Sequence, residues 1–540
     1  MHYKVREKNS DSIDQMSSSK KIVNEMSNCA CEAAKQPMRL GLSEVKRMCP
    51  FFNKAANSID QNIAKDLAPH CPVLSHVQRP TMIYNDTKTP APFRGKETLL
   101  VYPLKEEDFY EAKFAKKIDE LHADGRYRYF ANLQRVCGEF PNAIYKPDGC
   151  QDTKKVRIFC SNDYLGMGQH PDVLRACHDA IDKSGAGAGG TRNISGTTRF
   201  HVELEDELAS LHSKEKALVF SSCFVANDAT LTVMGKLLPG LVMISDHMNH
   251  ASMIDGIRHS GCQKIIYKHN DLEHLESILK SLPHDTPKLV IFESVYSMSG
   301  TISDIKATCE LAKKYNALTF LDEVHAVGMY GAHGAGVAER DGVLDMVDII
   351  TGTLGKAYGV GGGYIAGSSN FVDCVRSYAS GFIFTTAIAP VVAAGALAAV
   401  KHLKNSGAER AMQQRRVAQL KALAAARGLP LMDNPSHIVP ILVGDPVKCR
   451  QLTDALLTNH GIYLQPINYP TVAKGTERVR ITPGPLHKES DLVALVDALE
   501  YEWKRLGLTF TTQAITNKVV PPASASLGSV QQRLEMKLCV

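Results

Sequence analysis

Three stretches of the sequence place reactive side chains directly after apolar runs that are typical of buried strands. The run LTFL is followed by Asp322 and His325, and the run DIITGT is followed by Lys356 within the glycine-rich segment GTLGKAYG. A third run, ALVF, leads into Ser222 and Cys223 just before a helical pattern. Ligands of open α/β sheets bind at the carboxyl ends of the strands. The sequence thus offers a carboxylate, an amine and an anion-binding helix N-terminus at one edge.

This combination of groups matches the needs of pyridoxal phosphate. A lysine amine binds that cofactor covalently, a carboxylate pairs with its pyridinium nitrogen, and a helix N-terminus holds its phosphate. DEVH also fits the Walker B motif of a DExH-box NTPase, but no G-x-x-x-x-G-K-[ST] loop precedes it. A lone lysine after a strand is usually a solvated surface residue, and SSC is often a plain helix cap. The order of the three signals along the chain favours the cofactor site.

The stretch GAGAGGTRN, residues 185–193, contains the G-x-G-x-x-G spacing of dinucleotide-binding proteins. That spacing indicates a nucleotide site only when it follows a buried strand and opens a helix. Residues 171–184 instead carry apolar side chains at helical spacing, so the glycines follow a helix. The sequence therefore argues against an NAD site, and the glycines indicate a backbone that passes close to bound substrate.

Apolar runs alternate with helical patterns between residues 156 and 367, which predicts an α/β fold with a mostly parallel sheet covered by helices on both faces. Shorter strand patterns after a helical stretch near 390–427 predict a smaller α+β unit. The expected domains are a largely disordered N-terminal targeting and regulatory extension (1–106), a helical arm (107–155), a large cofactor-binding α/β domain (156–390), a C-terminal α+β domain (391–510) and a tail (511–540).

Composition limits the classes of function. The chain has 540 residues, of which 44% are hydrophobic and 22% charged, and its net charge of +5 is too small to indicate nucleic-acid binding. No apolar run reaches the roughly 20 residues of a membrane-spanning helix. The fourteen cysteines show no disulfide-like framework, which predicts reduced thiols in an intracellular compartment. No cysteine and histidine spacing matches a zinc site, so no metal is expected.

Several longer stretches resemble the α-oxoamine synthases, which are fold-type I pyridoxal-phosphate enzymes that condense an amino acid with an acyl-CoA. These stretches include GRYRYF, CSNDYLGMGQHP, SDHMNHASMIDGIRHSG, DEVHAVGMYG and GTLGKAYGVGGGY, and the similarity runs from about residue 110 to 509. The resemblance implies glycine and succinyl-CoA as substrates, and 5-aminolevulinate, CoA and carbon dioxide as products, at the first step of haem biosynthesis. It also implies a homodimer with active sites at the subunit interface, located in the mitochondrial matrix.

The same resemblance implies roles for residues around the cofactor. Lys356 would bind pyridoxal phosphate covalently and then act as the base that removes a Cα proton from glycine. Asp322 would face the pyridinium nitrogen and keep it protonated. His325 would bond the phenolic oxygen of the ring, and His250 would stack on the ring face. Further residues expected around the cofactor are Ser222, Cys223, Phe224, Ser297 and Thr353, together with Thr385 and Thr386 of the partner subunit.

Substrate-binding residues follow from the same motifs. Arg480 in RVRITP would clamp the glycine carboxylate with help from Asn162, a bidentate task that suits a guanidinium. Arg128 in GRYRYF would pair with the succinyl carboxylate, although the residues alone favour a surface ion pair for it. The remaining residues expected at the acyl group are Thr191, Asn193 and Thr471.

Two alternatives remain beside this interpretation. The chain could be an α-oxoamine synthase for another amino acid or acyl-CoA, and Arg128, Thr191 and Asn193 are the residues that distinguish this case. It could also be a non-catalytic subunit with the same fold, but the presence of both Lys356 and Asp322 counts against that.

The N-terminal hundred residues contain two Cys-Pro pairs, at Cys49 and Cys71. They resemble the haem regulatory motifs of eukaryotic family members, in which a cysteine thiolate binds the haem iron. The alternative is two ordinary thiols in a terminal extension. Basic residues and serines near the N-terminus fit a mitochondrial transit peptide, whereas Glu7, Asp11 and Asp14 do not. The expected mitochondrial location therefore rests mainly on the resemblance.

Overall fold

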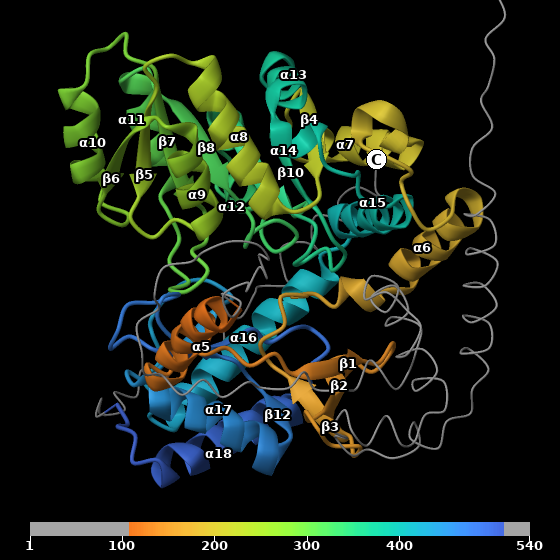
Figure 1. The fold of residues 1–540 in the computed structure, drawn as a ribbon, viewed down its shortest axis with the longest axis vertical. Helices are drawn as coiled ribbons and strands as arrows, with labels where there is room; N and C mark the ends of the chain where they lie inside the picture. Colours follow the sequence, from red (N-terminus) through yellow and green to blue (C-terminus); the bar gives the residue numbers. More distant parts are fainter. Residues whose placement is uncertain (1–106, 512–540) are drawn as a thin grey trace, which may run out of the picture. The chain divides into compact units, whose positions relative to one another are not determined.

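The computed structural model describes residues 107–511, and its largest sheet has seven strands in the order β4-β10-β9-β8-β7-β5-β6 (Figure 1). Only β10 runs antiparallel to its neighbours, β4 and β9, and all other pairs are parallel. The predicted mostly parallel sheet is therefore confirmed. The strands are β4 (Lys216–Phe220), β5 (Val242–Asp246), β6 (Gln263–Tyr267), β7 (Lys288–Glu293), β8 (Leu318–Asp322), β9 (Ile349–Thr353) and β10 (Gly363–Gly367).

The central strands are buried on both faces, which is why their sequences read as continuous apolar runs. Every residue of β7 is buried, including Lys288 at its start. The Lys288 ammonium donates to the carbonyls of Pro283 at 2.8 Å and Thr286 at 2.7 Å, so its burial leaves no unpaired donor. These strands end in polar residues at the same edge of the sheet, where ligands bind in this fold class.

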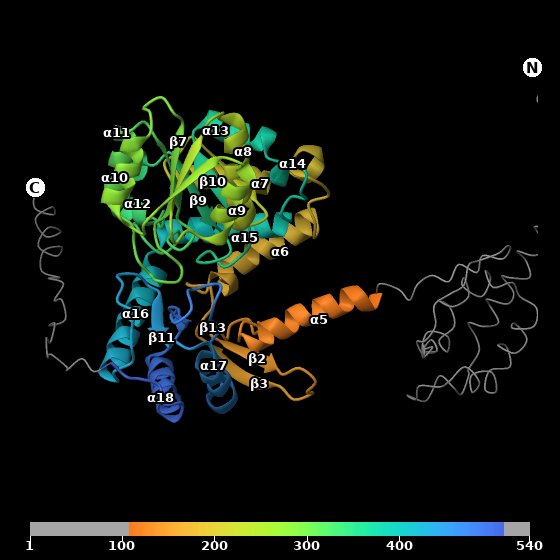
Figure 2. The same ribbon diagram turned by 60° about the vertical axis from the view of Figure 1, so that its left-hand side comes forward.

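Helices cover both faces of this sheet (Figures 1 and 2). Several begin at side-chain caps, such as Asp271, whose carboxylate accepts from the amide of His274, and Asp304, which accepts from that of Ala307. The main helices are α6 (Pro171–Ser184), α7 (Arg199–Leu211), α8 (Cys223–Leu237), α9 (Ala251–Ser260), α10 (Leu272–Ser281), α11 (Ile305–Lys314), α13 (Ser369–Tyr378) and α15 (Pro390–Asn405), with short helices α12 (Val337–Arg340) and α14 (Ser380–Ile383) between them.

The segment predicted as a helical arm over residues 107–155 is helical only at its start. Helix α5 (Glu107–Ala123) is followed by three antiparallel strands, β1 (Asn132–Arg135), β2 (Asn142–Lys146) and β3 (Lys154–Ile158). Strand β3 also pairs in parallel with β12 (Ile462–Tyr463), far along the chain. These short strands are mostly exposed and polar on one face, so their sequences lack a strong apolar pattern.

The C-terminal unit has its own three-stranded antiparallel sheet in the order β11-β14-β13. The stretch IYLQPIN, which reads as one strand, forms two, because β12 joins β3 while β13 joins β14. A core that includes Leu420, Leu456 and Trp503 lies among these elements. The elements are α16 (Ala408–Ala426), β11 (Val439–Leu442), α17 (Pro446–His460), β13 (Pro466–Ile467), β14 (Arg478–Ile481) and α18 (Glu489–Arg505).

The predicted boundary between residues 390 and 391 is misplaced. Helix α15 packs on α6 and α7, and its Leu397, Val400 and Leu403 belong to the hydrophobic core of the large sheet. The next helix, α16, instead packs on α18 in the C-terminal unit. The change of domain therefore lies at the α15–α16 junction, where Ser406 and Gly407 separate the two helices.

Some predictions fall on residues 1–106 and 512–540, outside the described residues. They include the N-terminal extension, the haem-motif cysteines Cys49 and Cys71, and nearly all of the predicted tail. Within residues 107–511, no helix combines the length and hydropathy that crossing a bilayer requires.

Candidate active site

A cavity of about 180 Å³ lies at the carboxyl ends of β4, β8 and β9. It brings together most of the residues that the sequence predicts around a cofactor, although they come from separate segments of the chain. The lining residues are Ser222, Cys223, Phe224, Asn227, His250, Ser252, Glu293, Asp322, Val324, His325, Thr353 and Lys356.

Asp322 ends β8 and is buried in the wall of this cavity. Its carboxylate accepts from the Asn227 side-chain amide at 2.9 Å and from the Val324 backbone amide at 2.8 Å. Burial raises the pKa of Asp322, and these two donors act in the opposite direction. Asp322 has no salt bridge to a lysine or arginine among residues 107–511. A protonated pyridine nitrogen would supply the missing cation, so the site fits the ring of pyridoxal phosphate.

Lys356 follows β9 and lies beside His325, with 3.2 Å between the lysine Nζ and the histidine Nε2. The other ring nitrogen of His325 is 2.7 Å from the Tyr164 hydroxyl. Burial lowers the pKa of His325 well below its usual range, and it lowers the pKa of Lys356 to about 8. A lysine amine with that pKa is available as a nucleophile and base near neutral pH.

A chain of polar groups connects Lys356 to the C-terminal unit. The Tyr164 hydroxyl is 3.4 Å from Asn162 Oδ1, and Arg480 Nη2 donates to the same Asn162 oxygen at 2.6 Å. If the ammonium of Lys356 donates to Nε2, the proton of His325 is on Nδ1 and faces the tyrosine oxygen. The tyrosine hydroxyl then donates to Asn162. With Lys356 as the donor at one end, this chain gives His325 the tautomer that is protonated on Nδ1.

The N-terminus of α8 forms part of the cavity wall. Ser222 is the N-cap residue, and its Oγ accepts from the Val225 amide at 3.2 Å. The free amides of the first turn suit a phosphate group. Gly363 on β10 allows this close packing, since a Cβ there would lie 2.1 Å from the backbone nitrogen of Cys223. Burial raises the pKa of the Cys223 thiol, so it is neutral and fills space rather than acting as a nucleophile.

His250 caps α9 at the cavity wall. Its Nδ1 is 2.8 Å from the Ser252 hydroxyl, and its backbone amide donates to Glu293 Oε1 at 2.7 Å. Glu293 ends β7 and is fully buried, and burial together with nearby Asp322 raises the pKa of Glu293 well above its usual range. Glu293 thus holds the loop that presents the imidazole, which is a positioning role.

Arg480 on β14 is 8% exposed and has no carboxylate partner among residues 107–511. Its guanidinium donates to Asn162 and to the carbonyl oxygen of Ser297, at 3.3 Å. A buried arginine without an anion fits a substrate carboxylate, which guanidinium binds in a bidentate manner. Ser297, expected near the cofactor ring, contributes its backbone carbonyl to this arginine.

The residues expected at the acyl group lie apart from this cavity within one chain. Arg128 Nη2 donates to Thr471 Oγ1 at 3.1 Å, and both residues are exposed. Thr191 Oγ1 donates to Asn193 Oδ1 at 2.6 Å. Thr191 also forms a β-bridge with Thr386, next to Thr385. None of these six residues lines the Lys356 cavity of the same chain.

Three residues of the site were missed from the sequence. Tyr164 lies in the stretch CSNDYLGM, which is itself part of the family resemblance, and it could have been found there. Asn227 lies one helical turn after Cys223, so its approach to Asp322 follows only once α8 is placed. Glu293 follows a buried strand, as Asp322 does, and that position is the signal that could have revealed it.

Comparison with known proteins places the chain in a family. The family model of class I and II aminotransferases matches residues 154–499. The 5-aminolevulinate synthase 1 of Cereibacter sphaeroides is 56% identical over 400 residues, which cover 74% of this chain and 98% of that protein. The mitochondrial 5-aminolevulinate synthase of Emericella nidulans is 48% identical over 479 residues, covering 85% of this chain and 70% of that protein.

Solved structures agree with this placement. Serine palmitoyltransferase of Sphingomonas wittichii superposes with a TM-score of 0.68 at 27% identity, covering 74% of this chain and 98% of that one. A serine palmitoyltransferase from S. paucimobilis with bound pyridoxal phosphate gives the same TM-score at 26% identity, covering 75% of this chain and all of that one. The residues of the Lys356 cavity fit that cofactor. The chain belongs to the 5-aminolevulinate synthases, acyltransferases of fold-type I that depend on pyridoxal phosphate.

Proposed function

We propose that this enzyme joins glycine to succinyl-CoA at the Lys356 cavity, and that it releases CoA, carbon dioxide and 5-aminolevulinate. The observation that carries this assignment is the polar chain from Lys356 through His325, Tyr164 and Asn162 to Arg480. It places a base with a lowered pKa and an arginine without a carboxylate partner in one connected network. A small amino acid requires both groups, one for its Cα proton and one for its carboxylate.

Pyridoxal phosphate, when bound, supplies an electron sink for the negative charge that develops on the glycine Cα. Lys356 would hold it covalently, Asp322 would face its ring nitrogen, and His250 would lie against the ring. Ser222 and Thr353 would contact the phosphate. Asn227 and Glu293 also line the cavity, and they orient Asp322 and the His250 loop.

Once glycine rather than Lys356 is bound to the cofactor, the Lys356 amine would be free to remove one Cα proton from glycine. The glycine Cα then forms a bond to the thioester carbonyl carbon of succinyl-CoA, the carbon–sulfur bond breaks, and CoA leaves. The carboxyl carbon of glycine departs as carbon dioxide, and a proton returns to Cα. Arg480 and Asn162 hold the glycine carboxylate during the first steps.

Arg128 and Thr471 form one half of the acyl site that we propose, and Thr191 and Asn193 form the other. All four are polar, and Arg128 supplies the positive charge for the terminal carboxylate of a succinyl group. An acetyl group or a long acyl chain offers no carboxylate to these residues. The acyl site therefore distinguishes succinyl-CoA from the thioesters of sister enzymes.

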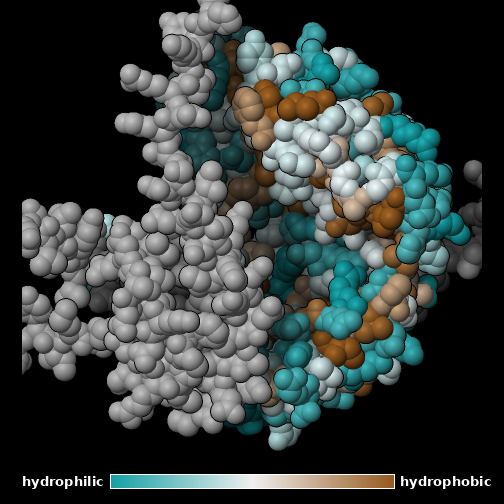
Figure 3. All heavy atoms as spheres, turned by 45° about the vertical axis from the view of Figure 1, so that its right-hand side comes forward, coloured by the Kyte–Doolittle hydropathy of each residue, from teal (hydrophilic) through white to brown (hydrophobic). Residues whose placement is uncertain are grey.

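The acyl site needs a second copy of the chain in this proposal. Thr191, Asn193, Thr385 and Thr386 do not line the Lys356 cavity of their own chain. Large apolar side chains near these threonines are exposed in the single chain, with Phe384 80% and Ile194 75% exposed. Figure 3 shows hydrophobic groups scattered among hydrophilic ones on one face of the molecule. A homodimer would bury such groups and bring the threonines to the partner's cofactor.

We make two further proposals, on location and regulation. We propose that the enzyme is located in the mitochondrial matrix, because it is similar to the mitochondrial 5-aminolevulinate synthases of Emericella nidulans, at 48% identity, and Yarrowia lipolytica, at 54%. Cys49 and Cys71 would bind regulatory haem, and replacement of both by alanine should then abolish the response of import or stability to haem.

The direct test measures CoA release by purified holoenzyme with glycine and each of three thioesters: succinyl-CoA, acetyl-CoA and a long-chain acyl-CoA. The proposal predicts release with succinyl-CoA alone, together with formation of 5-aminolevulinate. Release with another thioester would overturn the acyl assignment and indicate a sister synthase. No release from folded protein that holds its cofactor would indicate a non-catalytic subunit.

A further inference from the structure

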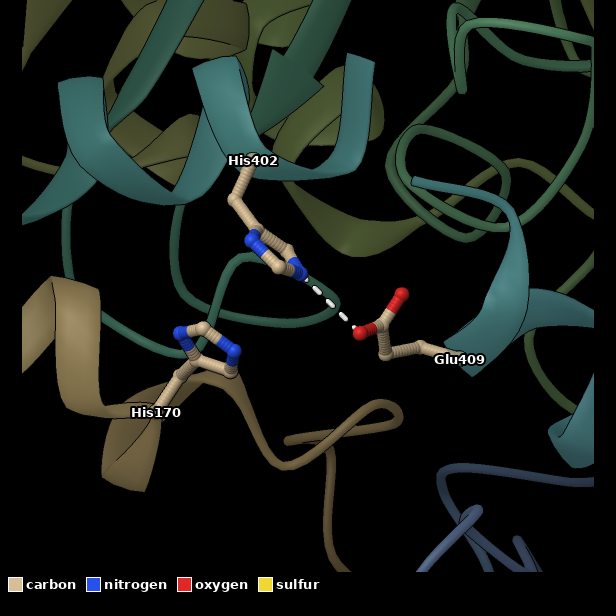
Figure 4. A group of neighbouring side chains, drawn as sticks. All are labelled: His170, His402 and Glu409. Carbon is tan, nitrogen blue, oxygen red and sulfur yellow. Dashed lines mark hydrogen bonds and ion pairs between the residues drawn. The ribbon is translucent and has the colours of Figure 1, made fainter. Parts of the chain in front are cut away.

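Three segments meet at a cluster of metal-binding side chains that does not line the Lys356 cavity. His170 caps the start of α6, His402 lies in the last turn of α15, and Glu409 lies in the first turn of α16. Figure 4 shows the two imidazole rings and the carboxylate turned toward one another. One donor atom from each residue lies within 4.8 Å of the other two. The described part of the chain holds no other such group of three.

The three side chains lie within ligand distance of one another and are already linked in part by hydrogen bonds. The imidazole rings of His170 and His402 are 4.1 Å apart between centroids, and their planes are tilted by 46°. His402 Nε2 is 2.9 Å from Glu409 Oε1. The three side chains are 21–25% exposed, so an ion could reach them from solvent while their positions are fixed by packing. The Ser406 hydroxyl donates to the other Glu409 oxygen at 2.6 Å.

A second carboxylate, that of Asp172, lies near the Nδ1 atoms of both imidazole rings. Asp172 Oδ2 is 3.6 Å from His402 Nδ1 and 3.8 Å from His170 Nδ1, and its other oxygen contacts Arg175. A carboxylate on the Nδ1 side favours a proton there and frees Nε2 to bind a metal. His170 Nδ1 now accepts a 3.3 Å bond from the Asp172 amide. Metal binding through Nε2 would exchange that long bond for a contact with the Asp172 carboxylate.

We propose that His170, His402 and Glu409 form a binding site for Zn²⁺, oriented by Asp172. Two neutral imidazoles and one carboxylate match the ligand preferences of zinc, with the fourth position open to water. Mg²⁺ prefers oxygen ligands and should bind poorly. The ion would stabilise the α15–α16 junction, since α15 packs in the large unit and α16 packs on α18.

The ligand spacing explains why the sequence gives no sign of such a site. His170 and His402 are separated by more than two hundred residues, and only Glu409 lies near His402 in the chain. Zinc motifs that can be recognised from sequence place their ligands in close pairs. Here the packing of α15 on α6 brings the two histidines together.

The test uses the holoenzyme after treatment with a chelator, titrated with Zn²⁺ against a chromophoric competitor. Two variants probe the site. Glu409→Gln keeps an oxygen that accepts from His402 but removes the negative charge, and His170→Asn keeps a side chain that caps helices well. His178→Asn, on the exposed side of the same helix α6, is the matched control.

We expect wild type and the His178→Asn control to bind one more equivalent of Zn²⁺ than either variant, or to bind it at least about tenfold more tightly. Zn²⁺ should raise the Tm of wild type and control but not of the variants, because an ion bound only to folded protein stabilises it. Co²⁺ should give visible absorption bands only in proteins with the intact site. Equal Zn²⁺ binding and equal Tm shifts in wild type and both variants would overturn the proposal and leave an ordinary hydrogen-bonded cluster.

Discussion

The Lys356 cavity and the proposed acyl site differ in how far a single chain forms each of them. Around Lys356, buried strand ends supply Asp322 and Glu293, and every polar group in the network has a partner inside the chain. The acyl residues Arg128 and Asn193 are exposed, and each is fixed by a single side-chain hydrogen bond, to Thr471 and Thr191 respectively. The first region is organised before any substrate binds, whereas the second, in our proposal, is completed by another copy of the chain.

This difference separates the common chemistry of the family from the choice of substrate. Proton transfer needs groups whose pKa values are shifted. Burial is the main cause of the lowered pKa values of Lys356 and His325. Recognition of a terminal carboxylate needs charge and reach, which exposed loops provide. Substitutions in the cavity should therefore reduce the rate with every thioester, while substitutions in the acyl site should change the preference among thioesters.

The largest effect is expected for Lys356→Ala, which removes the base and the covalent attachment of the cofactor. The loss in kcat should be at least about 10³-fold with any thioester, within the range for loss of a general base. Single-turnover CoA release is the measurement, and bound cofactor is quantified in parallel. Near-normal turnover in this variant would contradict the proposed role of Lys356.

Arg480→Lys should have the next largest effect. The substitution keeps the positive charge but loses the two parallel donors for a carboxylate, so the KM for glycine should rise about 10- to 100-fold. Arg478→Lys is the matched control, because it changes a buried arginine two residues earlier on β14 whose guanidinium contacts the Met298 carbonyl. Equal rises in both variants would show that Arg480 acts only by supporting β14.

Arg128→Ala and Asn193→Ala should change selectivity more than rate. We expect kcat/KM for succinyl-CoA to fall about tenfold in each, since each loses one polar contact to the acyl carboxylate. The values for acetyl-CoA should stay within about twofold. Arg126→Ala is the control, because Arg126 is paired with Asp124 on the same segment. An equal fall for both thioesters would contradict a role in recognising the carboxylate.

The smallest predicted effect is the pH dependence of cofactor uptake. The pKa of Lys356 is lowered to about 8, and only the neutral amine reacts with the aldehyde of pyridoxal phosphate. The rate at which apoprotein takes up the cofactor should therefore rise with pH and level off above about 8, as the ammonium loses its proton. Stopped-flow absorbance would follow the reaction. A rate that keeps rising through pH 10 would indicate an ordinary lysine.

Most of the residues that the sequence predicts around a cofactor line one cavity because they stand at the ends of strongly apolar strands. Asp322, His325 and Lys356 follow such runs, and the rule for ligand sites at strand ends then places them together. The sheet and its helices were predicted for the same reason. Glu293 also lies at the end of a buried strand, but it was not predicted as a site residue because a glutamate at that position belongs to no known motif.

Other features could not be predicted because they depend on packing between distant segments. Strand β3 pairs with β12, three hundred residues later, and its polar sequence gives no local sign of this. Helix α15 joins the large core through alanine, valine and leucine side chains and packs on α6, so the predicted domain boundary came one helix too early. The cluster of His170 and His402 arises from the same contact.

A mixed dimer tests most directly whether the two regions of one active site come from different chains. Differently tagged Lys356→Ala and Asn193→Ala chains are co-expressed, the heterodimer is isolated, and CoA release with succinyl-CoA at a subsaturating concentration is compared with both parent homodimers. If Asn193 serves the partner's Lys356, one of the two sites has both native residues, and about half of the wild-type activity should return. If both residues serve the same chain, neither site is intact, and activity near the mean of the two parents would contradict the account.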